Sequence, residues 1–456
     1  MSGRRTVGPA QPLVERLVTG ENVALAAILA VALVLRLAWI TIANPQPSSI
    51  TSGDPFFYDV FARFLADGEG FVRIGGQATA QWPPGYPAVL AVVFKLFGHK
   101  IILAKLLNVL LGTATCYLAY LIGKKVFNRA AGLTAAAVLA VFPSQVFQPT
   151  LLMSEVLATF LVALFVCLVV YFAVESLTWR RALAAGAFIG AISFVRGETI
   201  FLAAALIVVW VVASRSWLTG LRYGAMALAA TALVISPWVI RNWVRMDYPI
   251  LMSTGSAENL IAGHWPGADG KGSFVPILEV DRKYEGVPFP KNETLVYKEE
   301  TRRAIDFALH NPAKEAKLVP QKLWEFYRAD GKITLWIQKG TLGAPAFSSA
   351  EEDGWEALAN GYYWAVLVAA TTGALLWFST RDPRRVLLLM VVLYYSFLFG
   401  FVFIGEQRFH SALIPLFSVF AAACVVGLTE RARLRLTGSP RTAKEGVTTA
   451  SEDEPR

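Results

Sequence analysis

The chain has 456 residues, of which 55% are hydrophobic and only 16% are charged. A soluble globular domain carries about 25% charged residues, so this composition argues against a soluble protein. The formal net charge of +9 could indicate a nucleic-acid partner, but the Lys and Arg residues lie in short loops beside apolar runs. That distribution sets the orientation of a membrane protein. We therefore expect no nucleic-acid partner and an all-α polytopic membrane protein.

Apolar runs of about the length needed to cross a bilayer recur along the chain and predict about ten transmembrane helices. The runs fall near residues 22–43, 101–122, 130–148, 153–175, 180–195, 198–213, 221–240, 356–378, 385–404 and 410–429. The short apolar stretch 86–97 is expected to be an interfacial helix. Counting it as a span would scatter the basic clusters over both sides of the membrane, against the positive-inside rule.

This topology places both termini in the cytoplasm and predicts a multi-pass protein of the plasma membrane. The expected parts are a cytoplasmic segment 1–20, a transmembrane core 21–240 with a first outer loop 44–85, an extracytoplasmic loop region 241–355, C-terminal transmembrane helices 356–429 and a disordered cytoplasmic tail 430–456. Within the loop region, residues 293–310 and 312–328 have the pattern of amphipathic helices.

Acidic residues on the predicted outer face are the first candidates for chemistry, because ionisable groups at membrane depth are costly and tend to mark sites. Asp54 follows the first span in the sequence Ser-Gly-Asp-Pro-Phe-Phe-Tyr-Asp. It could cap a helix that starts there, or it could be a functional carboxylate. Asp59, in the same predicted helix, is expected to face the polar side. Glu406 lies between the last two spans.

Glu155 stands at the outer end of the fourth span, in the sequence Met-Ser-Glu-Val-Leu. Ser154 could cap this helix, and Glu155 would then complement the helix dipole. Alternatively, Glu155 could join Asp54 around a divalent metal ion or a substrate hydroxyl. A divalent metal ion is the one cofactor that the residues suggest.

Three arginines on the same face run against the positive-inside trend: Arg196, Arg241 and Arg408. They could anchor in lipid headgroups, or their guanidinium groups could bind a phosphorylated lipid. His264 and His410 are weak candidates as metal ligands, because neither lies in a motif with metal-ligand spacing. No Walker A loop or dinucleotide-binding turn is present, so cytosolic nucleotide chemistry is not supported.

Five segments, taken in order, resemble the GT-C superfamily of membrane glycosyltransferases. They are Asp54-Pro-Phe-Phe-Tyr-Asp59, Trp82-Pro-Pro-Gly-Tyr86-Pro, Leu-Leu-Met-Ser-Glu155, Pro-Trp-Val-Ile-Arg241-Asn-Trp and Glu406-Gln-Arg408-Phe-His410. The order and sidedness look most like the dolichyl-phosphate-mannose protein mannosyltransferases and the bacterial aminoarabinose transferase that acts on lipid A.

This resemblance implies a GT-C-like helix bundle and a hexosyltransferase that uses a polyprenyl-phosphate-linked sugar. The sugar would pass, with inversion, to a hydroxyl of a lipid, glycan or protein acceptor outside the cytoplasm. The implied roles are catalytic for Asp54 and Glu155 and donor phosphate binding for Arg241 and Arg408. Apart from the resemblance, candidates for substrate binding are Asp59, Tyr86, Arg196, His264 and Glu406. Pro55 follows Asp54 where the eukaryotic protein mannosyltransferases have a second acid, which weakens the case for a protein acceptor.

Two alternatives remain open from the sequence. The first is a lipid or solute transporter, which would need charges along a path through the membrane. Arg36 and Lys105 are the charged residues within apolar runs that could serve there. The second is an inactive scaffold of the same fold, which only an assay would distinguish.

Overall fold

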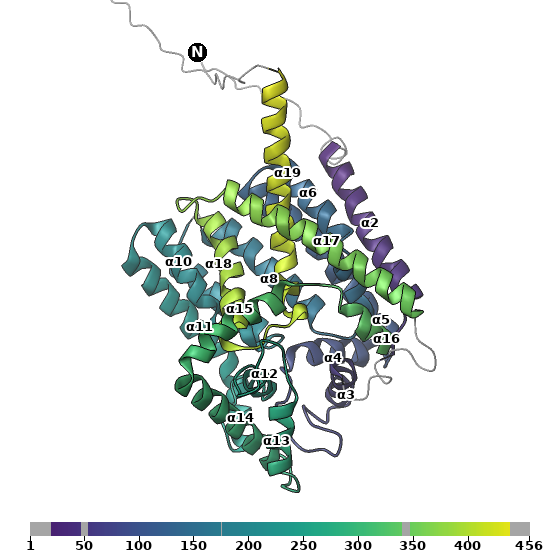
Figure 1. Cartoon of the computed structure of the whole chain (residues 1–456), viewed down its shortest axis with the longest axis vertical. Coiled ribbons are helices and arrows are strands. Elements are labelled where there is room, and N and C mark those ends of the chain that lie inside the picture. Colours follow the sequence, from purple (N-terminus) through teal and green to yellow (C-terminus); the bar gives the residue numbers. More distant parts are fainter. Residues whose placement is uncertain (1–19, 47–52, 175, 340–346, 438–456) are drawn as a thin grey trace, which may run out of the picture.

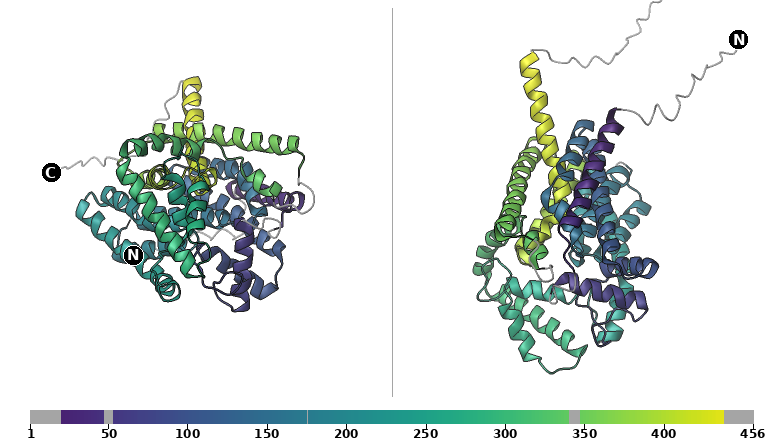
Figure 2. Two further views of the ribbon diagram at one scale, coloured as in Figure 1. Left: turned by 60° about the horizontal axis from the view of Figure 1, so that its bottom comes forward. Right: turned by 90° about the vertical axis from the view of Figure 1, so that its right-hand side faces the viewer.

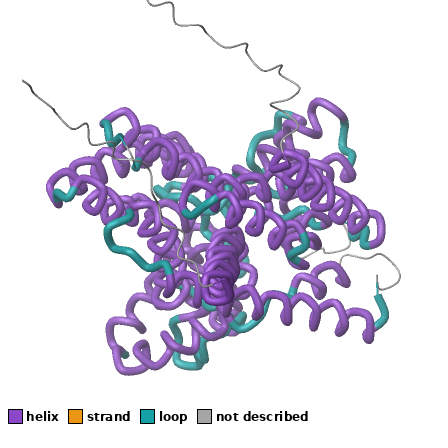
Figure 3. Tube along the Cα trace, turned by 90° about the horizontal axis from the view of Figure 1, so that it is seen from above, coloured by secondary structure: helices purple, strands orange, loops and turns teal. Residues whose placement is uncertain are grey.

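The computed structural model describes residues 20–46, 53–174, 176–339 and 347–437. These residues fold into helices joined by loops, and no strand occurs among them (Figure 3). The predicted all-α class is therefore confirmed for the described chain. Most of the predicted N-terminal segment 1–20 and the tail beyond residue 437 lie outside the described residues.

The first half of the chain contains the long helices α2, α5 and α11 and the shorter helices between them (Figure 1). In order the elements are α2 (Gly20–Ile42), α3 (Asp54–Asp67), α4 (Gly85–Phe97), α5 (Ile101–Val126), α6 (Arg129–Ala140), α7 (Pro143–Phe147), η2 (Gln148–Thr150), α8 (Glu155–Leu168), η3 (Val169–Ala173), α9 (Trp179–Ser193), η4 (Gly197–Phe201), α10 (Leu202–Ser214) and α11 (Trp217–Met246).

The second half begins with a group of mostly short helices and ends with three long ones. These elements are α12 (Gly255–Gly263), α13 (Val275–Lys283), α14 (Lys291–His310), α15 (Pro312–Tyr327), α16 (Ile333–Lys339), α17 (Ser349–Leu376), α18 (Pro383–Phe397), η5 (Leu398–Val402), η6 (Gln407–Leu413) and α19 (Ile414–Thr437). Helices α14 and α15 match the two amphipathic helices predicted over 293–310 and 312–328.

Seven helices of the described chain are long and apolar enough to cross a membrane, or eight if α6 and the α7–η2 pair form one broken span. The remaining two predicted spans correspond to α9, which has only 15 residues, and to α17, which packs along α19. Helix α4 has 13 residues, so it is about 20 Å long. This is shorter than the hydrocarbon core of about 30 Å, as expected for an interfacial helix.

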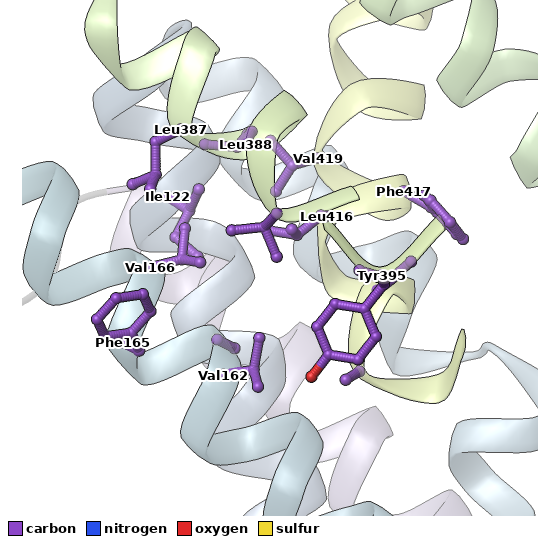
Figure 4. Packing of buried hydrophobic residues seen from close by; sticks show 14 of the residues in the cluster. Ile122, Val162, Phe165, Val166, Leu387, Leu388, Tyr395, Leu416, Phe417 and Val419 are labelled. Atoms are coloured by element: carbon purple, nitrogen blue, oxygen red, sulfur yellow. The ribbon is translucent and has the colours of Figure 1, made fainter. Parts of the chain in front are cut away.

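Apolar side chains from α5, α8, α18 and α19 form the centre of the largest buried cluster (Figure 4). The labelled side chains are Ile122, Val162, Phe165, Val166, Leu387, Leu388, Tyr395, Leu416, Phe417 and Val419. Helices that lie far apart in the sequence thus pack against each other, and the last span is enclosed by earlier ones.

Arg36 is fully buried in the first span, and its guanidinium group compensates a break in a neighbouring helix. The chain bends by 61° between α6 and α7. Pro143 at the start of α7 cannot donate a backbone hydrogen bond. Arg36 donates to the carbonyl oxygens of Ala140 at 3.1 Å and Leu139 at 3.4 Å, so these groups are satisfied inside the apolar core.

Different helices lie at the two ends of the molecule. The start of α2 and the end of α19 lie at one end, whereas α12, α13 and α14 lie at the other (Figures 1 and 2). Helices α3 and α4 lie in the half that contains α12 to α14. Helix α11 continues to Met246, beyond the predicted end of its span at residue 240, so Arg241 belongs to this helix.

Candidate functional site

Charged side chains from distant parts of the chain meet where α3, α8 and η6 begin. Nη1 of Arg408 lies 2.5 Å from Oδ2 of Asp54 and 3.7 Å from Oε1 of Glu155. Nη1 of Arg196 lies 3.5 Å from the same oxygen of Glu155. The structure therefore brings together four of the residues singled out in the sequence, two carboxylates and two guanidinium groups.

Asp54 does not cap α3, contrary to one of the two sequence interpretations. The N-cap residue is Gly53, and no side chain caps the helix. The Asp54 carboxylate instead accepts hydrogen bonds from Nε1 of Trp82 at 3.1 Å and from Arg408. Burial raises the pKa of Asp54. The charge of Arg408, these hydrogen bonds and the charge of Arg196 lower the pKa by more than burial raises it. The net effect is a lowered pKa, so Asp54 is ionised at neutral pH.

Glu155 is 5% exposed, and neither of its carboxylate oxygens has a hydrogen-bond partner within the described structure. Its nearest charged neighbours are the two arginines, at ion-pair distances. Ser154 does not cap α8 through its side chain, which corrects the sequence interpretation. Its hydroxyl oxygen accepts a hydrogen bond from the hydroxyl of Tyr58 at 3.2 Å. Because a buried carboxylate without hydrogen bonds is costly, Glu155 is suited to bind a group of an incoming molecule.

Arg196 is held in the site from two sides. Its Nε donates to Oε1 of Glu198 at 2.7 Å, and its guanidinium group lies 5.1 Å from the ring centre of Phe409. Burial lowers the pKa of Arg196, but the negative charges of Glu198 and Glu155 outweigh it, and the net pKa is raised. Arg196 therefore keeps its charge.

The Trp-Pro-Pro-Gly segment is fixed against the chain just before Arg196. The backbone N–H of Gly85 donates to the carbonyl oxygen of Phe194 at 2.6 Å. A Cβ atom at Gly85 would lie only 2.6 Å from that oxygen. Only glycine allows this close approach, which positions Trp82 beside Asp54.

A pocket adjoins Glu155 and Arg408. Its lining residues are Gln148, Met153, Glu155, Val156, Asp330, Lys332, Ile333, Trp336, Glu406, Gln407 and Arg408. Nζ of Lys332 lies 2.9 and 3.0 Å from the two carboxylate oxygens of Glu406. Sequence reasoning placed Glu406 near the site but missed Lys332, because a single lysine in a polar segment carries no signal of its own.

Arg241 is not brought to this cluster. It donates to the carbonyl oxygens of Thr79 and Phe71, at 2.6 Å each, and its guanidinium group lies 4.8 Å from the ring centre of Trp238. These contacts tie the loop between α3 and α4 (residues 68–84, the α3–α4 loop) to α11. The structure thus gives Arg241 a role in holding this loop.

Three other candidates, Tyr86, His264 and Asp59, form hydrogen bonds or ion pairs with residues other than Asp54 and Glu155. Tyr86 is fully buried, and its hydroxyl accepts a hydrogen bond from Asn108 at 3.1 Å. His264 is buried, with its Nδ1 3.0 Å from Glu315. Asp59 was expected to face the polar side.

The expectation for Asp59 is wrong, because the residue is only 5% exposed. Its carboxylate oxygens lie 2.6 Å from Nε2 of His99 and 3.3 Å from Nε of Arg63. His410 is likewise fully buried, with its Nε2 3.1 Å from Asp330. Both residues are thus paired with neighbouring side chains.

Asp54 and Glu155 were also predicted as metal ligands. Among the residues that the structure describes, no group of three or more His, Cys, Asp or Glu side chains could hold a metal ion. The space between the two carboxylates contains the guanidinium group of Arg408. The two carboxylates therefore form an incomplete ligand set, and a metal ion there would have to displace the arginine.

Comparison with known proteins gives a family match over part of the chain. Residues 81–241 match the family model described as dolichyl-phosphate-mannose-protein mannosyltransferase. This range includes Trp82, Glu155, Arg196 and Arg241, and it excludes Asp54 and Arg408. A search of curated protein sequences finds no match.

Several solved structures are similar to most of this chain, each at low sequence identity. The oligosaccharyltransferase AglB of Archaeoglobus fulgidus, in complex with an inhibitory peptide and a dolichol-phosphate, aligns with a TM-score of 0.50 and 13% identity over 92% of this chain and 52% of that chain. A complex of the same enzyme with Zn and sulfate also gives 0.50 and 13%, over 91% and 50%. ArnT from Cupriavidus metallidurans, bound to undecaprenyl phosphate, gives 0.44 and 15%, over 90% and 79%.

The chain spans about half the length of the archaeal oligosaccharyltransferase. At such low identity the alignment establishes a common fold. Together with the family match over residues 81–241, it confirms the predicted resemblance to the GT-C superfamily of membrane glycosyltransferases.

Proposed function

We propose that the protein is a membrane glycosyltransferase that moves a sugar from a polyprenyl-phosphate donor to a hydroxyl group of an acceptor, with inversion at the anomeric carbon. The observation that carries this proposal is the position of Arg408 between the carboxylates of Asp54 and Glu155. An ionised base and a cation that can bind phosphate are thereby placed next to each other. Solved neighbours in complex with a dolichol-phosphate or undecaprenyl phosphate support the donor class.

In this mechanism Asp54 is the general base. Its carboxylate takes the proton of the acceptor hydroxyl while that oxygen forms a bond to the anomeric carbon. The bond between the anomeric carbon and the phosphate oxygen breaks, and polyprenyl phosphate leaves with the electron pair. No protein nucleophile is needed, and a single displacement inverts the configuration.

Arg408 stabilises the negative charge that develops on the departing phosphate. A guanidinium group matches two phosphate oxygens at once. In the structure Arg408 pairs with Asp54 instead, so donor binding would exchange one anion for another and leave the Asp54 carboxylate accessible to the acceptor. Lys332, now paired with Glu406 beside the same pocket, is the second cation that can reach the phosphate.

A transporter is the alternative function, and the buried charges do not favour it. The guanidinium group of Arg36 is bound to backbone carbonyl oxygens. Nζ of Lys105 donates to Oδ1 of Asn44 at 2.6 Å and to the carbonyl oxygen of Pro45 at 2.7 Å. Both charges are thus engaged in fixing the helices and the start of a loop.

We further propose that the site faces the extracytoplasmic side of a plasma membrane and that both termini are cytoplasmic. The start of α2 and the end of α19 lie at the opposite end of the molecule from α12, α13 and α14, which supports this orientation (Figure 2). In this arrangement residues 241–355 form the extracytoplasmic region between the transmembrane parts 21–240 and 356–429.

The test is an assay of the purified protein in lipid with radiolabelled polyprenyl-phosphate sugars and a panel of hydroxyl acceptors. We expect label to appear on an acceptor and polyprenyl phosphate to be released in equal amount. Movement of the labelled lipid across the vesicle membrane without any transfer of the sugar would overturn the proposal in favour of a transporter.

A further inference from the structure

The pocket beside Arg408 is lined by buried side chains whose oxygens accept no hydrogen bond within the described structure. Glu155, Asp330 and Gln407 line it and are 5%, 6% and 7% exposed. Both carboxylate oxygens of Glu155, Oδ2 of Asp330 and Oε1 of Gln407 lack a hydrogen-bond partner there. Leaving buried polar atoms unpaired costs free energy. Such oxygens on three side chains around one pocket therefore indicate a ligand that donates hydrogen bonds.

The fold holds Asp330 next to the helix that carries Gln407. Gln407 and His410 are three residues apart in the 3₁₀ helix η6, and residues with this spacing lie on the same face of such a helix. Nε2 of His410 lies 3.1 Å from Oδ1 of Asp330. The backbone N–H of Asp330 donates to Oδ1 of Asn360 at 2.8 Å. Asp330 is thus fixed through one carboxylate oxygen and its backbone, and its other oxygen is left for a ligand.

The size of the pocket restricts what can enter it. Its cavity volume is about 20 Å³, which is enough for a group about the size of a water molecule. A whole sugar ring does not fit into this space, whereas a single hydroxyl substituent does. The ring would stay at the mouth, beside Trp336, which also lines the pocket. The ring centre of Trp336 lies 5.6 Å from the guanidinium carbon of Arg408, so a sugar there would be close to a phosphate on Arg408.

The charges around the pocket favour a neutral group over a cation. Three carboxylates line it, and two of them face basic side chains. Glu155 lies 3.5 and 3.7 Å from the guanidinium groups of Arg196 and Arg408. Glu406 lies 2.9 Å from Nζ of Lys332. A bound cation would add positive charge to carboxylates that are already compensated.

The third carboxylate, Asp330, is compensated by His410. Nδ1 of His410 lies 2.6 Å from the carbonyl oxygen of Phe326, and a carbonyl oxygen only accepts, so Nδ1 carries a hydrogen. The contact between Nε2 and Oδ1 of Asp330 needs a second hydrogen, on either atom. In both cases the pair of side chains has no net charge. The ligand group is therefore expected to be a neutral hydroxyl.

We propose that Asp330 and Gln407 bind a hydroxyl group of the sugar that the donor carries. The hydroxyl donates its hydrogen to Oδ2 of Asp330. The amide of Gln407, with its oxygen and nitrogen exchanged by rotation, donates to the hydroxyl oxygen. Glu155 is left to accept from a neighbouring hydroxyl of the same ring. The identity of the ligand as the donor sugar rests on the proposed function.

The test measures binding of the donor lipid without turnover. The dissociation constant of the purified protein is measured for polyprenyl phosphate and for a panel of polyprenyl-phosphate hexoses and pentoses. We expect at least one glycosylated lipid to bind more tightly than polyprenyl phosphate. Because the lipid and the phosphate are common to both, the ratio of the two constants reports the contacts to the sugar.

Gln407→Leu is the sharpest variant, because it removes the amide and keeps a side chain of similar size. We expect the affinity for the tightest glycosylated lipid to fall by about tenfold, the loss of about one hydrogen bond. The affinity for polyprenyl phosphate should stay the same. Since the lost oxygen has no partner, the thermal midpoint without ligand should be unchanged or higher. A residue that only supports the structure would lower this midpoint.

Asp330→Asn keeps the test valid if Gln407→Leu does not fold. It weakens a hydrogen bond to a charged group, so it should also lower the affinity for the glycosylated lipid alone. The matched control is Gln321→Leu, which removes an exposed glutamine on α15 and should change neither affinity.

Equal losses for both lipids in Gln407→Leu and Asp330→Asn would show that these residues only support Arg408, and would overturn the inference. So would an unchanged affinity for the glycosylated lipid, or a panel in which no sugar improves binding. A protein that binds a glycosylated lipid through these residues but transfers no sugar overturns the proposed function alone. Transfer at the same rate in both variants at limiting donor overturns this inference alone.

Discussion

Carboxylates from two regions, Asp54 of α3 and Glu293 of α14, contact the same α3–α4 loop, and they differ in their partners. Asp54 and Glu155 lie between the guanidinium groups of Arg408 and Arg196. Glu293, in the neighbouring helix α14, is instead enclosed by the hydroxyls of Thr79 and Thr254 and the backbone N–H of Ala80. We call Asp54 and Glu155 with their two arginines the matched group. In this group Arg408 can exchange the Asp54 carboxylate for another anion, as a phosphate-bearing donor requires. The Glu293 carboxylate, with hydrogen bonds to the N-cap residue of α12 and to the loop, is suited to fixing the loop.

The largest effect is expected from Asp54→Asn, which removes the base from the matched group. Turnover should fall by ~10²–10⁴-fold, because general base catalysis contributes about this much. The measurement is the initial rate of sugar transfer by folded protein at saturating donor. Asp67→Asn is the control, since Asp67 is exposed at the end of the same helix, and its rate should not change. A near-normal rate in Asp54→Asn would end its assignment as base.

Arg408→Ala tests the cation in the matched group. We expect donor affinity to fall by about 10- to 100-fold, because hydrogen bonds to charged groups contribute about 1.5–3 kcal/mol. Affinity is measured by binding of polyprenyl phosphate to the purified protein. The control is Arg328→Ala, which breaks a surface ion pair with Glu325 and should leave the affinity as it is. Equal affinities in the two variants would remove Arg408 from the donor site.

Arg241→Ala sharpens the distinction between an arginine that binds substrate and one that holds a loop. Its loss leaves the carbonyl oxygens of Thr79 and Phe71 without their donor. We expect the free energy of unfolding to fall by about 1–3 kcal/mol, measured by denaturant titration in detergent. Donor affinity of the folded protein should stay the same, and a lowered affinity with unchanged stability would instead support the sequence prediction for Arg241.

The smallest effect concerns the pH dependence of transfer. Because Arg408 and Trp82 lower the pKa of Asp54, the base stays ionised until the pH falls below the ordinary aspartate value. Activity should therefore be lost on the acid side only below that value. In the residual activity of Arg408→Ala, the pKa of Asp54 rises and the acid limb should move to higher pH. A limb that stays in place would show that another group titrates.

Much of the fold could be predicted from the sequence, because span length and basic clusters follow from the bilayer itself. The bend between α6 and α7 could not, since it depends on Arg36 in another helix supplying donors to the released carbonyl oxygens. The predicted span over α11 ended at residue 240, whereas the helix continues to Met246. Its last turns are polar, and they remain helical because Arg241 and Asn242 find partners in the α3–α4 loop and at Ile250.

The candidate site was only partly predictable for a similar reason. Sidedness placed Asp54, Glu155 and Arg408 on one face, and the structure brings them together. The burial of Asp59 depends on His99, and the position of Lys332 depends on Glu406. Such pairings join residues far apart in the sequence, and the partners His99 and Lys332 lie in none of the five segments that carry the resemblance.

The account depends most on Arg408 exchanging Asp54 for the phosphate of the donor. The direct measurement is an experimental structure of the protein with bound polyprenyl phosphate. We predict phosphate oxygens within hydrogen-bond distance of the Arg408 guanidinium group and an Asp54 carboxylate that no longer pairs with it. A phosphate bound elsewhere, with the Asp54–Arg408 pair intact, would contradict the proposed site.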